Sequence, residues 1–361
     1  MPTSRRIGPC LVLLACALAS PLTAQVKLSG YGEASYSYAS KPAGDIIVGR
    51  LFDRFANQFT LNGLKLVAER PAATDKWDAG VRADLVLGQN AAVLQSSGLN
   101  LGGSGDMTQL FVTLNIPTAN KNGIQFKVGK FVTLMGLEVL ETVANPNWSE
   151  GLQFVYVENF THTGLEIGHR LSPQLDFQVR VTNGWDRVQA AGGNAEVMAR
   201  VGITPSASTS LGVIGYSGAM QSGSDALRTG FSALLNQKFG TMSLWIQADY
   251  GSEAANANLS DPTQDASWIG FGAWLAFDLT PKAGLAIRAD HVNDSNGART
   301  GGVFGTGGAE HKLTSLTGTL NLKTWPNALV RPELRFDNSN LAVFDGSESQ
   351  ITLGLSVAYI F

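Results

Sequence analysis

The chain has 361 residues, 44% of them hydrophobic and 15% charged, and its formal net charge is −3. This composition is too apolar for a disordered chain, and no internal apolar run reaches the roughly 18 residues of a transmembrane helix. Its 41 glycines and 13 prolines indicate many short strands joined by turns, so we expect an all-β fold. The acidic charge balance leaves no basic surface of the kind that binds nucleic acid.

Residues 1–24 have the pattern of an export signal peptide. Arg5 and Arg6 form a basic start, an apolar stretch follows, and Ala24 is a small residue at the expected cleavage position. Without the two arginines, the remaining chain has 24 basic and 29 acidic residues and a net charge of −5. The protein is therefore expected to be exported, with a mature chain of residues 25–361.

Two alternatives to a cleaved export signal exist for this segment. A membrane anchor would need about 20 uninterrupted apolar residues, and Pro9 and Pro21 interrupt the stretch. A lipoprotein signal could end at Cys16, but the bulky Leu14 and the apolar residues that follow disfavour it. Both cysteines, Cys10 and Cys16, lie in this segment, so the exported chain would have no thiol for a disulfide, a nucleophile or a soft-metal site.

Beyond the export signal, apolar and polar residues alternate in many short stretches. Two clear cases are residues 77–87 and 328–336; in the second, Arg331, Glu333 and Arg335 alternate with apolar side chains. A period of two places the two kinds of side chain on opposite faces of a strand. A soluble β-sandwich also alternates, but its strands are usually shorter than about 10 residues. The stretches here run for about 9 to 13 residues, which suits tilted strands that cross a bilayer.

We predict sixteen such strands, which form a transmembrane antiparallel β-barrel. They begin near Val26, Phe55, Lys76, Thr108, Gly123, Glu158, Gln174, Ala195, Thr209, Leu227, Thr241, Trp268, Ala283, Lys312, Ala328 and Gln350. The even-numbered strands lead into short turns, and the odd-numbered ones lead into long loops such as residues 91–105 and 293–309. Short periplasmic turns and long extracellular loops are typical of outer-membrane barrels. A phase shift near Asn62 and Gly63 indicates a bulge in the second strand.

The charges of one hairpin predict its register. A turn at residues 172–174 places Arg170 opposite Asp176 and Glu166 opposite Arg180, with apolar pairs on the other face. The hairpin is therefore expected to carry two ion pairs on the inner wall of the barrel.

The C-terminal stretch, residues 350–361, alternates to its end at Phe361. It resembles the terminal strand that outer-membrane barrels present to their assembly machinery, and an exposed strand edge suits recognition by strand addition. The alternative is the last strand of a soluble sheet, which the export signal disfavours. We expect the barrel assembly machinery to bind the strand that ends at Phe361.

Four motifs carry a family resemblance: Gly129–Leu134, Asn145–Ser149, Asn159–Gly164 and Val181–Asp186. With them the chain resembles the OmpL-like outer-membrane β-barrel porins. The motifs span about 60 residues, and the rest of the chain fits the family in architecture only. The resemblance implies a porin in the lipid of a Gram-negative outer membrane. The chain lacks the Pro-Glu-Phe-Gly-Gly element of general enterobacterial porins, so their constriction is not carried over.

A barrel of sixteen strands is too wide for side chains to fill, and such barrels usually hold a water-filled channel narrowed by a loop. The candidate constriction loop is residues 131–151, which is long and unusually apolar between Val132 and Leu140. It also carries Glu138 and Glu141. The alternative is that this loop caps the barrel from outside.

The inward phase of the strands carries charges of both signs. The predicted pore-lining arginines are Arg82, Arg170, Arg180, Arg200, Arg288, Arg331 and Arg335. Carboxylates are interspersed with them, so we expect weak ionic selectivity. If the loop folds inward, Glu138 and Glu141 would face this arginine wall and create a transverse field. Alternatively, most of these charges form ion pairs that hold the wall together.

Three tryptophans share the inward phase, namely Trp245, Trp268 and Trp274. They would either form a stacking track for sugars or simply pack together. In the predicted register, Trp274 lies opposite Arg288, where a cation–π contact is possible.

The sequence as a whole predicts a passive outer-membrane channel for small hydrophilic solutes. The alternative is a structural or surface-interaction barrel without an open pore. The four histidines form no catalytic constellation, so we expect neither an enzyme nor a bound cofactor or metal. A homotrimer is expected only by likeness to other sixteen-stranded porins.

Overall fold

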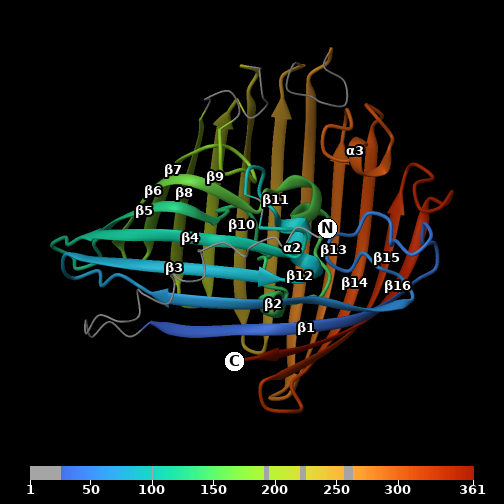
Figure 1. Cartoon of the computed structure of the whole chain (residues 1–361), viewed down its shortest axis with the longest axis horizontal. Helices are drawn as coiled ribbons and strands as arrows, with labels where there is room; N and C mark the ends of the chain where they lie inside the picture. Colours follow the sequence, from blue (N-terminus) through green and yellow to red (C-terminus); the bar gives the residue numbers. More distant parts are fainter. Residues whose placement is uncertain (1–25, 100, 191–194, 220–224, 256–262) are drawn as a thin grey trace, which may run out of the picture.

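The computed structural model describes residues 26–99, 101–190, 195–219, 225–255 and 263–361. The predicted export signal, residues 1–24, lies outside this part of the chain. The described residues form sixteen antiparallel strands that close into one barrel (Figure 1). All sixteen predicted strands are confirmed, and each begins within three residues of the expected position.

The strands are β1 (Lys27–Ala39), β2 (Gln58–Arg70), β3 (Asp78–Leu87), β4 (Gly105–Ile116), β5 (Ile124–Val132), β6 (Thr161–Ser172), β7 (Leu175–Thr182), β8 (Glu196–Ser206), β9 (Thr209–Gly218), β10 (Arg228–Phe239), β11 (Met242–Glu253), β12 (Ala266–Thr280), β13 (Ala283–Asp294), β14 (His311–Leu322), β15 (Ala328–Ser339) and β16 (Ser349–Ile360). Short helical segments lie between some of them: α2 (Gln89–Leu94), η1 (Thr142–Ala144), the π-helical turn η2 (Gln153–Val157) and α3 (Gly301–Phe304). Within the described residues, no helix is long and apolar enough to span a membrane.

The first and last strands close the barrel. β1 pairs with β16 from Tyr31 opposite Ile360 to Ala39 opposite Thr352. Both edges of β16 are therefore paired, since its other edge pairs with β15. In Figure 1 the strands of the near wall, β1 to β4, cross those of the far wall at a large angle, as strongly tilted strands do.

The burial pattern is the reverse of that of a soluble protein. In β15, Arg331 and Arg335 are buried, whereas Leu334 and Phe336 are 54% and 42% exposed on the outer face. Exposed apolar side chains recur on the outer faces of other strands, as in β16, where Leu353 is 51% exposed. A continuous apolar outer surface of this kind is suited to lipid rather than water.

Two local predictions of register are confirmed. The pairing of β1 with β2 shifts at Asn62, which places a bulge where the hydrophobic phase changes. In the β6–β7 hairpin, Glu166 lies opposite Arg180 and Arg170 opposite Asp176, and a second irregularity follows at the turn. The alternation of the sequence therefore determines which side chains face the interior.

The connections differ between the two ends of the barrel. At one end the strands are joined by short turns, such as the two residues between Phe239 and Met242. At the other end the loops are long, and several fold back over or into the barrel, including those that contain α2 and α3. The longest described excursion is residues 133–160, between β5 and β6. We call this segment the inward loop.

Candidate functional site

The inward loop lies inside the barrel, where it contacts strands from opposite walls. It begins two residues later than predicted, because β5 includes Phe131 and Val132, and it continues beyond Gly151 to Phe160. The extra residues include η2, which packs on β12 and β13. Each of its attachments to the wall can be traced to named side chains.

Glu138 attaches the loop to β12 and β13. Its Oε1 accepts hydrogen bonds from Arg288 Nη1 at 2.8 Å and from Trp274 Nε1 at 2.9 Å. Its Oε2 accepts a bond from the backbone N–H of Gly151 at 2.6 Å, which ties the two limbs of the loop together. Arg288 and Trp274 face each other in the predicted register, and both bind this one carboxylate. All three side chains are buried, so the carboxylate is fixed by a charge-assisted hydrogen bond from Arg288 and a directional one from Trp274.

The next part of the loop is attached to β14 and β15. The backbone N–H of Trp148 donates to Glu333 Oε2 at 2.8 Å, and Asn147 Nδ2 donates to Thr319 Oγ1 at 2.7 Å. Arg335 Nη1 donates to the carbonyl oxygen of Glu150 at 2.6 Å. The bonds of Glu333 and Arg335 satisfy backbone groups of the loop that would otherwise be buried without a partner.

A third attachment joins the loop to β1. Arg331 donates to the carbonyl oxygen of Thr142 at 2.6 Å and to Glu33 Oε1 at 2.7 Å. Thr142 Oγ1 in turn donates to Glu33 Oε2 at 2.8 Å. The structure thus places Arg288, Arg331 and Arg335 on the inner wall but beneath the loop, where they hold it.

A fourth attachment joins the loop to β2, the neighbour of β1. Glu141 forms an ion pair with Lys65, whose Nζ also lies 2.9 Å from Asp84 Oδ2. Arg82 is the neighbour of this cluster, with its Nε 2.8 Å from Asp84 Oδ1 and its Nη1 3.3 Å from Glu69. The loop is thus attached to an arc of the wall that runs from β13 through β15 and β1 to β2.

The remaining predicted arginines lie on the β6–β8 wall. Arg180 pairs with Glu166 at 2.5 Å, as the predicted register requires. Asp176, however, pairs with Arg200 of β8 at 2.5 Å, so its ion pair is with the other neighbouring strand and not with Arg170. Arg170 lies beside a cavity near the end of the barrel that carries the short turns.

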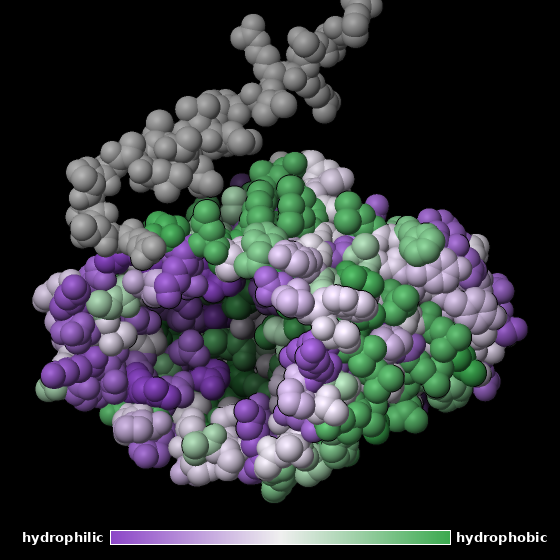
Figure 2. Space-filling view, turned by 90° about the horizontal axis from the view of Figure 1, so that it is seen from below, coloured by the Kyte–Doolittle hydropathy of each residue, from purple (hydrophilic) through white to green (hydrophobic). Residues whose placement is uncertain are grey.

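The described residues leave three sizeable cavities in the lumen, two of which are lined by the inward loop. The largest, about 700 Å³, is enclosed by residues 132–141 of the loop and the walls of β1 to β5. A second of about 500 Å³ lies along β5 to β8, and a third of about 440 Å³ lies between residues 143–146 and the ends of β10 to β15. Figure 2 shows a hollow on the face of the molecule seen from below, with hydrophilic residues around it and hydrophobic residues within.

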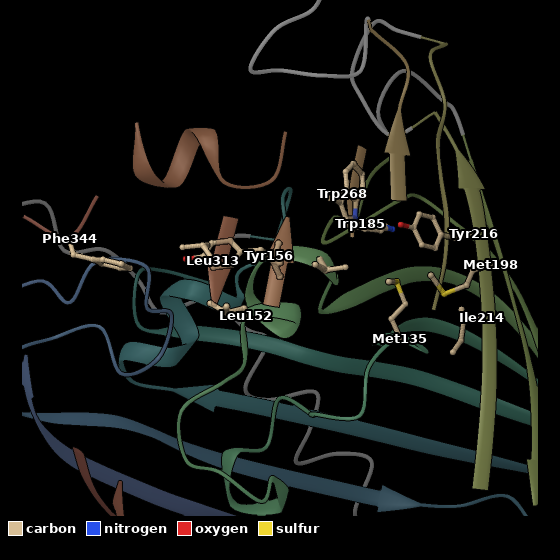
Figure 3. Packing of buried hydrophobic residues seen from close by; sticks show 12 residues of the cluster. Met135, Leu152, Tyr156, Trp185, Met198, Ile214, Tyr216, Trp268, Leu313 and Phe344 are labelled. Carbon is tan, nitrogen blue, oxygen red and sulfur yellow. The ribbon is translucent and has the colours of Figure 1, made fainter. Parts of the chain in front are cut away.

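Part of the lumen is filled by an apolar cluster. Met135 of the inward loop points toward Met198 and Ile214 of the wall, while Trp185 and Trp268 pack further along (Figure 3). Of the two alternatives for the three tryptophans, simple packing therefore holds for Trp268 and Trp274. Trp268 and Trp274 are only 1% and 2% exposed, so neither offers a face for stacking with a solute.

Two carboxyl groups of the inward loop, those of Glu150 and Glu158, have strongly raised pKa values. Burial raises the pKa of Glu150 and of Glu158 well above the usual value, and nearby negative charges, chiefly Asp53 and Asp249 respectively, raise both further. Gln247 Nε2 donates to Glu158 Oε1 at 2.5 Å and to Asp249 Oδ2 at 2.9 Å, so the two acids share one amide donor. Both loop acids are therefore favoured in the neutral form while the loop is in place.

Two of the residues that hold the loop, Glu33 and Lys65, were not predicted, although they lie on the inward phase of their strands and alternation could have identified that phase. Asp290 and Glu333 are among the carboxylates that alternation does place on the inward phase beside the arginines. Alternation could not show that any of these four residues contacts the loop, because those contacts span 76 to 185 positions in the chain.

Comparisons with known proteins agree with this architecture. The family model described as "Putative beta-barrel porin-2, OmpL-like" matches residues 25–361. None of the curated proteins matches the chain.

Several solved structures share the fold at low sequence identity. The outer membrane channel DcaP of Acinetobacter baumannii is 13% identical with a TM-score of 0.59, and the match covers 95% of this chain and 99% of that chain. The anion-selective porin from Comamonas acidovorans is 10% identical with a TM-score of 0.65, covering 93% and 99%. OmpT of Vibrio cholerae in its trimer form is 11% identical with a TM-score of 0.61, also covering 93% and 99%. With a family match over the whole of residues 25–361, the chain belongs to the OmpL-like β-barrel porin family of the outer membrane.

Proposed function

We propose that the barrel is a passive channel for small hydrophilic solutes and that the inward loop forms its narrowest part. The observation that carries the proposal is the attachment of one loop to strands five positions apart around the barrel: Glu138 to Arg288 of β13 and Glu141 to Lys65 of β2. A loop held in this way reduces the cross-section of the lumen but leaves cavities of about 700 and 440 Å³ beside it and one of about 500 Å³ along β5 to β8. Loops that fold into wide barrels commonly set the pore size.

The charges around the largest cavity support weak ionic selectivity. Four basic side chains line it, Lys65, Arg70, Arg82 and Lys127, and so do the three acids Glu69, Glu138 and Glu141. A nearly balanced lining gives a small net field along the channel and a local field across it.

Recording of single channels in planar bilayers tests the proposal. The purified, folded protein should give stable steps of current that rise linearly with voltage, with a reversal potential near zero in a salt gradient. A correctly folded barrel that gives no conductance would contradict the proposal and favour a structural or surface-interaction barrel.

We further propose that the channel assembles as a trimer. Support comes from the similarity to OmpT of Vibrio cholerae, whose structure was solved in a trimer form. Native mass measurement in detergent should give three times the mass of the exported chain. A monomeric mass in mild detergents and after extraction from membranes would contradict it.

A further inference from the structure

We propose that the largest lumen cavity binds amphipathic zwitterions, with apolar α-amino acids as the solute class. The proposal rests on the channel function above and adds the class of solute. It combines an apolar ledge on the inward loop with charges of both signs on the wall that faces the ledge.

The ledge is formed by two residues of the inward loop, Leu134 and Val139, which line the cavity. Val139 is 42% exposed, although most other apolar side chains of the loop are buried against the wall. The lumen of a channel is filled with water, so an apolar side chain that faces it contributes no hydrophobic stabilisation until a solute covers its surface.

The ledge is held in a fixed position. Asn145 receives a hydrogen bond from the backbone N–H of Val139 at 2.8 Å and donates one to its carbonyl oxygen at 2.8 Å. Earlier on the same limb, Thr133 Oγ1 accepts a bond from the N–H of Met135 at 3.0 Å, which fixes the chain at Leu134. A preformed apolar surface costs little conformational entropy when a solute binds it.

Basic groups lie on the strands that line the same cavity. The side chain of Arg82 is 26% exposed and that of Lys127 is 22% exposed. Lys127 Nζ lies 5.0 Å from the ring centre of Phe111, so a positive charge sits directly beside apolar surface. Arg82 has five N–H donors and Lys127 three, more than their hydrogen bonds to wall carboxylates use, so both can still bind a solute carboxylate.

Acidic groups complete the site. Glu69 and Glu141 line the cavity with side chains 37% and 25% exposed. They can receive an ammonium group while the basic residues receive the carboxylate. A solute with a single charge would pair with only the basic or only the acidic side chains. A sugar would bury little apolar surface on the ledge. The cavity volume of about 700 Å³ is ample for one amino acid with water around it.

The experiment is current interruption by added solute in the bilayer recording. Leucine and asparagine are the probes, because both are zwitterions of similar size and only leucine has an apolar side chain. Leucine should bind about fivefold more strongly than asparagine, as partial burial of its side chain predicts. The two analogues with a single charge, 4-methylpentanoate and 3-methylbutylamine, should each bind less well than leucine.

Variants locate the effect on the ledge. Leu134→Ser with Val139→Ser should reduce leucine binding to the level of asparagine, and the single change Val139→Thr, which keeps the shape of the side chain, should produce part of this loss. Val143→Ser is the matched control, since Val143 lies on the same loop but lines a different cavity. Equal binding of leucine and asparagine by the wild type, or a preference that survives both ledge variants, would overturn the proposal. Failure of the channel function itself would instead appear as absence of conductance.

Discussion

At the scale of single residues, the buried arginines of the lumen act as attachment points for the inward loop. Arg288 is fully buried and contacts Glu138 at 2.8 Å, and it also donates to the carbonyl oxygen of Ser149 at 2.5 Å. Removing one partner of such a buried pair leaves the other charge without compensation, which costs about 3–5 kcal/mol. This loss should destabilise the attachment of the loop rather than the barrel, because the strands retain their own hydrogen bonds.

Arg288→Met should therefore loosen the inward loop and give a larger, noisier single-channel conductance. Arg200→Met is the matched control, because Arg200 lies on the inner wall and pairs with Asp176, away from the loop. Equal conductance in the Arg288 variant, the Arg200 variant and the wild type would show that Arg288 does not hold the loop.

Glu158 should make attachment of the loop dependent on pH. A released loop loses the proton of Glu158 near the ordinary value of 4.5, whereas the attached loop keeps it because burial and Asp249 raise the pKa. The attached state thus binds more protons, and its stability falls as the pH rises above about 4.5. The negative charge of Glu138 also raises the pKa of Glu158.

Current fluctuations should accordingly increase between pH 5 and pH 8 in the wild type and increase less in Glu158→Gln, in which, of these two loop acids, only Glu150 still carries a raised pKa. If the variant retained the full pH dependence of the wild type, Glu158 would not be responsible for it.

At the scale of elements, the β6–β7 hairpin shows how far charge and alternation determine the structure. Glu166 pairs with Arg180 and with Lys127 of β5, at 2.5 and 2.8 Å. Glu166→Arg would place three positive charges together on a mostly buried wall and should lower the temperature of barrel unfolding. Adding Arg180→Glu should recover part of the loss.

The measurement is the temperature at which the folded barrel converts to the unfolded form, which migrates more slowly on a denaturing gel. Arg170→Glu serves as the comparison and should have a smaller effect, because Asp176 opposite it already pairs with Arg200. A double variant no more stable than Glu166→Arg alone would contradict the assigned register.

The strands could be predicted from sequence because each depends on a local pattern of period two. The inward phase of Lys65 follows from the same pattern once the bulge at Asn62 is included. The ion pair of Asp176 could not be predicted, since opposite and diagonal neighbours offer partners of similar quality. The contacts of Glu138 and Glu333 could not be predicted either, because they join a loop to strands that are distant in the sequence.

At the scale of the whole molecule, the family assignment confirms the predicted outer-membrane porin, which is a channel and not an enzyme. The pairing of both edges of β16 adds a constraint on assembly. If the machinery recognises the strand that ends at Phe361 by strand addition, it must do so before β16 pairs with β1 and the barrel closes.

The central claim is that the inward loop sets the size of the pore. Its most direct test is the single-channel conductance of a variant that lacks Met135–Thr142, the part of the loop that carries both Glu138 and Glu141. Heat-dependent gel migration first establishes that the variant is a folded barrel. Because the deletion removes the attachments to Arg288 and Lys65 and empties part of the lumen, we predict a conductance severalfold above that of the wild type. A folded variant whose conductance equals that of the wild type would contradict the claim.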